Sequence, residues 1–170
     1  MRKCRGVTVI ELLVTLTVMA ILAAVAVPSF VDFVRQNRVS GAANEFVAAL
    51  GLARSEAIRR AGTVTLCKSS DQAQCTTAGD WSQFVLVFVD GGVQGTLDGG
   101  DAIVRVLASQ GNGVAIDSAE FSNWISYTPL GFSRGNGGAT SGTFTACGAP
   151  YARSVTINNT GRVSIAQTTC

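Results

Sequence analysis

The chain has 170 residues, of which 13 are lysine or arginine, 11 are aspartate or glutamate, and none is histidine. The lack of histidine excludes Ser-His-Asp and Cys-His nucleophile pairs and removes the commonest metal ligand. Three of the 13 basic residues stand before Gly6, so the rest of the chain has 10 basic and 11 acidic side chains, a formal charge of −1. Phosphate binding depends on cationic contacts, so bulk charge does not select nucleic acid as a partner.

An apolar run near the N-terminus extends from Gly6 to Val27 and contains one ionisable residue, Glu11. About 20 apolar residues are enough for a helix to cross a bilayer. A carboxylate inside such a helix costs roughly 2.5–3.5 kcal/mol, so its presence indicates a partner and a function. We therefore expect residues 7–29 to form a transmembrane helix.

The basic residues before this run set its expected orientation. Arg2, Lys3 and Arg5 predict an N-terminus that stays in the cytoplasm, with everything after the span exported. The alternatives are an ordinary secretory signal peptide, cleaved near Ala26, and a simple membrane anchor, which would gain nothing from Glu11. Such a peptide should have an apolar core of about 7–15 residues, whereas this run is longer and holds Glu11 where the core should be apolar.

The helical pattern continues beyond Pro28, and residues 30–61 are expected to form an amphipathic helix. Apolar residues recur three or four positions apart or adjacent on one stripe, as one buried helix face requires; they are Phe30, Phe33, Val34, Val39, Ala42, Ala43, Phe46, Leu50, Ala53 and Ala57. Proline removes a backbone donor and clashes with the preceding turn, so we expect a kink at Pro28. Gly62, after the basic pair Arg59-Arg60, suits a helix C-terminus.

The remaining residues, 62–170, are predicted to form one antiparallel β domain. Short β-branched or aromatic runs alternate with Gly, Asn and Asp clusters; the runs are 63–67, 84–89, 103–107, 114–116, 124–127, 143–147, 154–157 and 162–165. Residues 158–161 resemble a hairpin turn. Two glycine-rich stretches, 91–100 and 131–142, are expected to be mobile surface loops.

Five cysteines indicate export to an oxidising compartment. Cys4 lies in the basic head, which leaves an even four. Four cysteines allow three pairings, of which we favour Cys67–Cys75 with Cys147–Cys170. A four-cysteine zinc site is the alternative, but neither pair has the usual C-x2-4-C spacing.

No pattern in the chain indicates an enzyme, a metal site or a cofactor. Asp90, Asp98 and Asp101 lie in a glycine-rich stretch, but they do not form the D-x-[DN]-x-[DN]-G pattern of a calcium loop, and solvated turn residues are the better interpretation. The glycines of residues 131–138 lack the G-x-x-x-x-G-K-[ST] element of a phosphate-binding loop. We therefore expect no catalytic residues and no cofactor.

The N-terminal residues resemble the class III signal of type IV pilins and of type II secretion pseudopilins. This resemblance rests on the basic head ending in Gly6 and on the sequence from Val7 to Val14 with Glu11 inside it, although the family usually has phenylalanine where Val7 stands. It implies that residues 1–6 are a leader, that prepilin peptidase cuts between Gly6 and Val7, and that the new amine of Val7 is methylated.

Later motifs resemble the minor pilins of the FimT and FimU type, which share a GspH-like domain. The motifs are residues 52–58, 64–67, 81, 87–90, 98–101, 103–106 and 161–163. The resemblance covers nearly the whole chain and implies an α+β, pilin-like fold, in which a long N-terminal helix packs on a C-terminal antiparallel β domain. Residues 7–29 then lie in the membrane first and in a filament core later.

The resemblance implies a minor pilin of a type IV pilus, in the tip complex that primes assembly. Glu11 would pair with the amine of a neighbouring subunit, or with Val7 of its own chain before assembly. The expected partners are prepilin peptidase, other major and minor pilins or pseudopilins, the inner-membrane assembly platform, and membrane lipid before assembly. The expected location is the bacterial inner membrane, with the N-terminus cytoplasmic and the C-terminal domain periplasmic, and later the pilus or pseudopilus.

Two alternatives remain open at this point. One is a minor pseudopilin of the type II secretion system, which would use the same chemistry. The other is a DNA-binding minor pilin for natural transformation, whose relatives carry a C-terminal G-R-x-R element. Here that element reads Gly161-Arg162-Val163-Ser164, so Arg162 is left as a weak DNA contact that Arg134 and Arg153 could support, and nucleic acid is not the expected partner.

Overall fold

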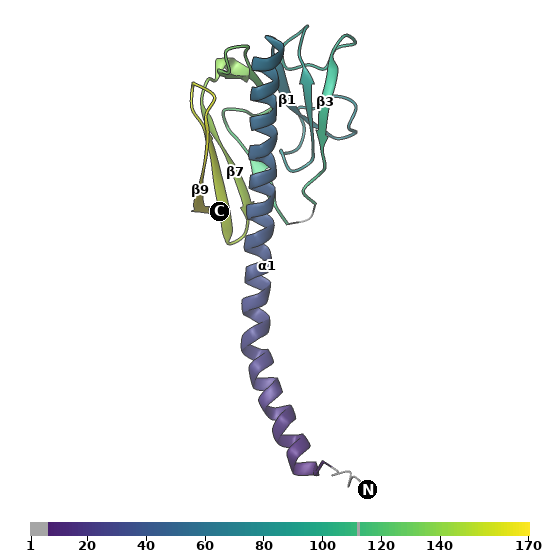
Figure 1. Ribbon diagram of the computed structural model, residues 1–170, viewed down its shortest axis with the longest axis vertical. Coiled ribbons are helices and arrows are strands. Elements are labelled where there is room, and N and C mark those ends of the chain that lie inside the picture. The colour runs from purple at the N-terminus through teal and green to yellow at the C-terminus, as the bar shows by residue number, and fades with distance from the viewer. Residues whose placement is uncertain (1–6, 112) are drawn as a thin grey trace. The chain divides into compact units, whose positions relative to one another are not determined.

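The computed structural model describes residues 7–111 and 113–170, which divide into one unit ending at Arg35 and another beginning at Gln36 (Figure 1). One long helix, α1 (Val9–Arg60), precedes nine strands and a short 3-10 helix. These elements are β1 (Val64–Ser69), β2 (Phe84–Val89), β3 (Ala102–Leu107), β4 (Ala115–Asp117), β5 (Trp124–Tyr127), β6 (Ser133–Gly135), η1 (Asn136–Gly138), β7 (Gly142–Gly148), β8 (Tyr151–Ile157) and β9 (Val163–Thr169).

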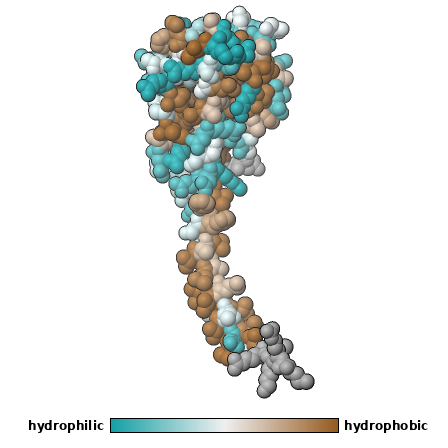
Figure 2. All heavy atoms as spheres, in the orientation of Figure 1, coloured by the Kyte–Doolittle hydropathy of each residue, from teal (hydrophilic) through white to brown (hydrophobic). Residues whose placement is uncertain are grey.

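The first unit consists of the N-terminal part of α1, which exposes nearly all of its apolar side chains (Figure 2). Within the described residues, α1 is the one helix long and apolar enough to cross a membrane, and its most apolar stretch is not covered by other parts of the chain. Pro28 lies inside the helix, whose assignment continues without a break on both sides. The kink expected at Pro28 stays a prediction.

In the second unit, one face of α1 is buried by the β domain. The buried positions recur with helical spacing and are Val39, Ala42, Ala43, Phe46, Ala49, Leu50, Ala53 and Ala57. Five of these eight are alanine, which has the highest helix propensity. The expected amphipathic pattern is therefore present, from Val39 onward.

The helix ends one residue earlier than the glycine signal indicated. The backbone N–H of Gly62 donates to the Ala57 carbonyl at 3.2 Å, and that of Ala61 donates to the Ile58 carbonyl at 3.3 Å, which together form a Schellman motif. The left-handed residue of this motif is Ala61, with φ of 51°, rather than Gly62. Glycine still follows, but the strained position is held by alanine.

The β domain contains two antiparallel sheets. The first has the strand order β3-β2-β1-β5-β6, and the second has the order β4-β7-β8-β9. An aromatic cluster joins the elements: Phe46 of α1, Trp81 and Phe121 all lie near Phe144 of β7, with ring centroids 4.7–5.4 Å from it. The indole N–H of Trp81 donates to the carbonyl of Phe121 at 2.8 Å, so the one polar atom of this ring is satisfied in the core.

The predicted strands correspond to eight of the nine, and the exception is informative. Residues 131–142 were expected to be a mobile loop, but they contain β6 and η1, so that expectation was wrong. Ser133-Arg134-Gly135 lacks an apolar alternation, and its pairing with β5 is visible only in three dimensions. In residues 91–100 the structure has neither helix nor strand, in agreement with the sequence.

Both disulfides join the pairs that the sequence favoured. Cys67 is bonded to Cys75, eight residues away, and Cys147 is bonded to Cys170, 23 residues away. The second bridge holds the end of β9 against β7, which is two strands away in the same sheet. It therefore fixes a strand that is exposed along most of its length.

Lys68 anchors the loop that the first disulfide closes. Its ammonium group donates to the carbonyl oxygens of Thr77 and Gly79, at 3.2 and 2.8 Å. Burial lowers the pKa of this lysine, because desolvation disfavours its charged form. The charge is thus held by carbonyl dipoles rather than by a directly bonded carboxylate.

We predict that losing the Cys147–Cys170 bridge destabilises the exported domain more than losing Cys67–Cys75. Loop-closure entropy gives about 3.4 kcal/mol for a loop of 23 residues and about 2.5 kcal/mol for a loop of eight, and β9 would also fray. The measurement is a urea melt of the domain truncated to begin near Phe30, with both cysteines of one pair changed to alanine. Equal or reversed losses would contradict this ranking, and non-reducing peptide mapping checks the pairing.

Candidate functional site

The first turn of α1 is closed by reciprocal hydrogen bonds between Thr8 and Glu11. The backbone N–H of Glu11 donates to Thr8 Oγ1, and the backbone N–H of Thr8 donates to Glu11 Oε2, both at 3.3 Å. The hydroxyl of Thr8 also donates to the same carboxylate oxygen. This arrangement is a capping box, which satisfies backbone donors that the helix start would otherwise leave free.

Sequence reasoning treated Glu11 only as a charge and missed Thr8. The signal was present, because Thr-x-x-Glu immediately before an apolar run is a signature of a helix N-terminus. Within the chain, the structure shows Glu11 in contact with Thr8. The pairing of Glu11 with the amine that cleavage would free on Val7 stays a prediction. Within the described residues Oε1 of Glu11 has no hydrogen-bond partner, so this oxygen is available to another molecule.

Val7 precedes the helix and is largely exposed. Gly6, the other half of the expected cleavage site, lies outside the described residues, as does the whole expected leader, 1–6. Cleavage and methylation at Gly6-Val7 thus stay predictions as far as the geometry is concerned.

Arg54 of α1 joins two turns of the β domain. Its Nε donates to the carbonyl oxygen of Gly131, and its Nη2 donates to that of Thr160, both at 3.0 Å. The two turns also pack closely on each other, since a Cβ at Gly161 would collide with the carbonyl oxygen of Gly131. Gly161 has φ of 74°, so this turn requires glycine for its backbone conformation as well as for space.

The next turn of the helix carries a charge cluster on its surface. The guanidinium groups of Arg59 and Arg60 bond the carboxylate of Glu56 and hold its pKa at about 2, well below its ordinary value. Because the folded-state pKa is depressed, this cluster favours the folded state above the ordinary pKa of a glutamate, and the contribution is lost as the pH falls toward 2. Both arginines are exposed, so the energetic effect of the cluster is small.

The candidate DNA-contacting arginines lie on different segments of the β domain. Arg162 is exposed at the turn before β9. Arg153 of β8 donates from Nε and Nη2 to Ser40 Oγ of α1, at 3.2 and 3.1 Å, so it is used within the fold. Arg134 lies on β6, in the other sheet.

The aspartates of the glycine-rich loop bind the loop's own backbone. Asp90 accepts from the N–H of Gly95 at 2.8 Å, Asp98 accepts from that of Val93, and Asp101 accepts from that of Gly91. The described residues contain no group of three acidic or cysteine side chains placed to hold a metal ion. These carboxylates act as turn residues. Asp90, however, is buried and also accepts from the hydroxyl of Thr65 at 2.6 Å, so the expectation that it is solvated was wrong.

Two family profiles match the chain. Residues 1–27 match the prokaryotic N-terminal methylation motif, and residues 42–161, more than half of the chain, match the type II transport protein GspH. The chain belongs to the GspH family. It is a minor pilin or pseudopilin, and its methylation motif indicates processing by prepilin peptidase.

Solved structures show the same fold at low identity. The type IV minor pilin FimU of Pseudomonas aeruginosa is 20% identical, with a TM-score of 0.59 over 79% of this chain and 92% of that one. The minor pseudopilin EpsH of the Vibrio cholerae type 2 secretion system is 14% identical, with a TM-score of 0.52 over 76% of this chain and 97% of that one. The predicted α+β, pilin-like fold is thereby confirmed. A search of curated protein sequences gave no significant match.

We predict that Arg54→Ala lowers the free energy of unfolding of the exported domain by about 1.5–3 kcal/mol, because two charge-assisted hydrogen bonds to turn carbonyls are lost. The matched control is Arg59→Ala, five positions along the same helix, whose side chain is 63% exposed and whose ion pair is worth about 0–1 kcal/mol. Urea melts of the two variants provide the comparison. Equal losses would show that Arg54 does not clamp the turns.

Proposed function

We propose that this GspH-family chain is a minor pilin of a type IV pilus, in the complex that primes assembly at the tip. Its role is structural, and it is a substrate of prepilin peptidase. The observation that carries the proposal is the methylation motif, followed by an apolar helix whose only early charge is Glu11. A leader with Arg2, Lys3 and Arg5 supports a cytoplasmic N-terminus and a periplasmic β domain.

The proposed mechanism uses the second oxygen of Glu11. Cleavage after Gly6 frees the amine of Val7, which remains basic after methylation. In an apolar filament core, burying an amine or a carboxylate without a partner costs much free energy. The Val7 amine of one subunit and the Glu11 carboxylate of its neighbour therefore stabilise the axial offset between subunits at which the two groups pair. The capping box with Thr8 holds the carboxylate at the helix start and leaves Oε1 free for this pair.

The assignment to a pilus rather than to a secretion pseudopilus rests on narrower features. The two disulfides and the Arg54-Ser55-Glu56-Ala57 sequence favour the minor pilins of the FimT and FimU type. The description of the matching family favours the second candidate, a minor pseudopilin of the type II secretion system. The two candidates share the cleavage site, the methylated amine and Glu11, and they differ in the fibre that takes up the subunit.

Processing of the N-terminus provides one test of the proposed function. Intact-mass analysis of protein extracted from membranes should show loss of residues 1–6 and gain of one methyl group, because Gly6 precedes the apolar helix. The control is a Gly6→Val variant, which should keep its full mass. A wild-type mass that corresponds to cleavage near Ala26 would indicate a secretory signal peptide instead.

Variants of Glu11 and Thr8 provide a second test of the proposed function, which separates the charge of Glu11 from its capping role. Glu11→Gln keeps the capping box, since glutamine serves in it as well as glutamate, but removes the charge. Thr8→Ala removes the cap and keeps the charge. We expect Glu11→Gln and Glu11→Ala to be absent from sheared pili although membranes contain them, and Thr8→Ala and Asp32→Ala to be incorporated.

Normal incorporation of Glu11→Gln would contradict the charge pair. If the wild-type chain is missing from sheared pili and its deletion abolishes protein secretion instead, the pseudopilus is the correct assignment.

A further inference from the structure

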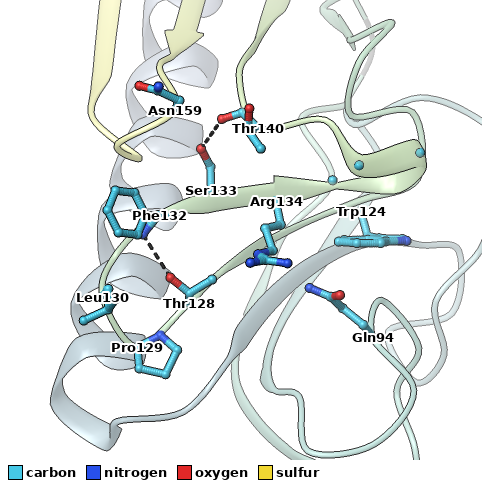
Figure 3. Close-up of a pocket in the computed structure, with 13 residues that line it drawn as sticks. Gln94, Trp124, Thr128, Pro129, Leu130, Phe132, Ser133, Arg134, Thr140 and Asn159 are labelled. Carbon is cyan, nitrogen blue, oxygen red and sulfur yellow. Dashed lines mark hydrogen bonds between the residues drawn. The ribbon is translucent and has the colours of Figure 1, made fainter.

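A hollow of about 800 Å³ opens on the β domain between segments that are far apart in the sequence (Figure 3). The β5–β6 hairpin contributes Trp124, Phe132 and Arg134, the loop after β2 contributes Gln94, and the turn before β9 contributes Asn159. This volume is within the range of small-ligand pockets, about 300–1,000 Å³. The proposed assembly role of Glu11 and the N-terminus uses none of these residues.

The walls of this hollow are fixed by the fold. The hydroxyl of Ser133, which is buried, lies within hydrogen-bond distance of the carbonyl oxygens of Thr140 and Asn158, at 2.6 and 2.9 Å, and so ties the hairpin to two other segments. On another side, Gly95 packs so close to the indole of Trp124 that a Cβ there would collide with it. A site built this way loses little conformational entropy when it binds.

The polar side chains in the hollow are one cation, two amides and the hydroxyls of Thr128, Ser133 and Thr140. Arg134 is the one charged residue in the lining. It also borders a smaller adjoining hollow with Asp90, whose carboxylate is already engaged by the Thr65 hydroxyl and the backbone N–H of Gly95. Within the described part of the chain, the side chains of Arg134, Gln94 and Asn159 have no hydrogen-bond partner. Figure 3 shows Arg134 in the middle of the hollow, with Trp124 and Gln94 to one side of it. The site therefore presents unused donors, and its charge calls for an anion.

The remaining wall is apolar and exposed. Leu130 is 78% exposed and Phe132 is 45% exposed, and both lie with Pro129 on the side of Arg134 away from Trp124 (Figure 3). A planar guanidinium fork matches a carboxylate in two parallel hydrogen bonds. A carboxylate at Arg134 would place the neighbouring part of its ligand against this apolar wall.

We propose that this hollow binds an acidic peptide segment of a partner protein, in which one Asp or Glu carboxylate pairs with Arg134 and an adjacent apolar side chain packs on Phe132 and Leu130. A nucleic acid would require several cations along its backbone, whereas the lining holds one. A second copy of this chain is a poor source of the carboxylate. Nine of its 11 acidic side chains already accept hydrogen bonds within the chain.

The test uses the full chain in detergent micelles and a dye-labelled peptide, Gly-Phe-Asp-Leu-Gly with blocked ends. The matched peptide has asparagine in place of aspartate, and binding is followed by fluorescence anisotropy against empty micelles. We expect the aspartate peptide to bind at least tenfold more tightly than the asparagine peptide. Arg134→Gln should remove this difference and Arg134→Lys should keep part of it. The control Arg162→Gln changes an exposed arginine outside the hollow and should leave the difference intact.

Several outcomes would overturn the proposal. The first is that the two peptides bind equally well or that neither binds. The second is that Arg162→Gln reduces the difference between the peptides as much as Arg134→Gln does. The third is that Arg134 is needed instead for binding a dT12 oligonucleotide, while the peptide does not bind, or for self-association of the chain. Far-ultraviolet circular dichroism of each variant shows whether it is folded, and Phe132→Ala offers a second variant that leaves the arginine in place. The mass and the fibre incorporation of the wild type do not depend on this site, so failure here leaves the assembly role intact.

Discussion

The fold depends on the burial of one face of α1 by the two sheets of the β domain. The face is rich in small residues, with Phe46 as its one large aromatic ring, and that ring enters the cluster around Phe144. Both the sheets and the helix would expose apolar surface without this contact, at roughly 25 cal/mol for each Å². The packing of α1 on the sheets thus forms the core to which the turns, disulfides and loops are attached.

The same helix carries a second constraint at its other end. From Val9 to Val27 it is apolar on all sides and is not covered by its own chain, which is the pattern of a helix that is buried in a bilayer or among other helices. A charge there must be compensated. Thr8 donates a hydrogen bond to the Glu11 carboxylate and accepts one from the backbone N–H of Glu11, which caps the start of the helix. The same carboxylate therefore stabilises the helix start and, in the proposed function, takes part in assembly.

Arg54 links the helix to two turns of the β domain. By holding Gly131 and Thr160 it fixes the turns that frame the β5–β6 hairpin, and Ser133 fixes the hairpin to its other neighbours. A surface formed by turns is usually the most variable part of a domain, but here hydrogen bonds to the helix and between turns define it. A preformed hollow with Arg134 at its centre is the consequence.

The sequence by itself determined the elements whose signal is local. The apolar run with Glu11, the stripe from Val39 to Ala57, and eight β-branched or aromatic runs depend on periodicity and composition, and the family motifs add the pilin-like fold. The pairing that the sequence favoured, Cys67–Cys75 with Cys147–Cys170, is the one that the structure contains.

What tertiary structure alone decided are contacts between distant segments. Strand β6 has no apolar alternation and exists because β5 pairs with it, and the left-handed end of α1 lies at Ala61 because the terminal hydrogen bonds, rather than the glycine, set that position. The Arg54 clamp spans 77 and 106 residues of sequence, and the hollow around Arg134 combines three segments. Such sites depend on distances that no local pattern encodes, since neighbours in space are set by how the sheets pack on the helix.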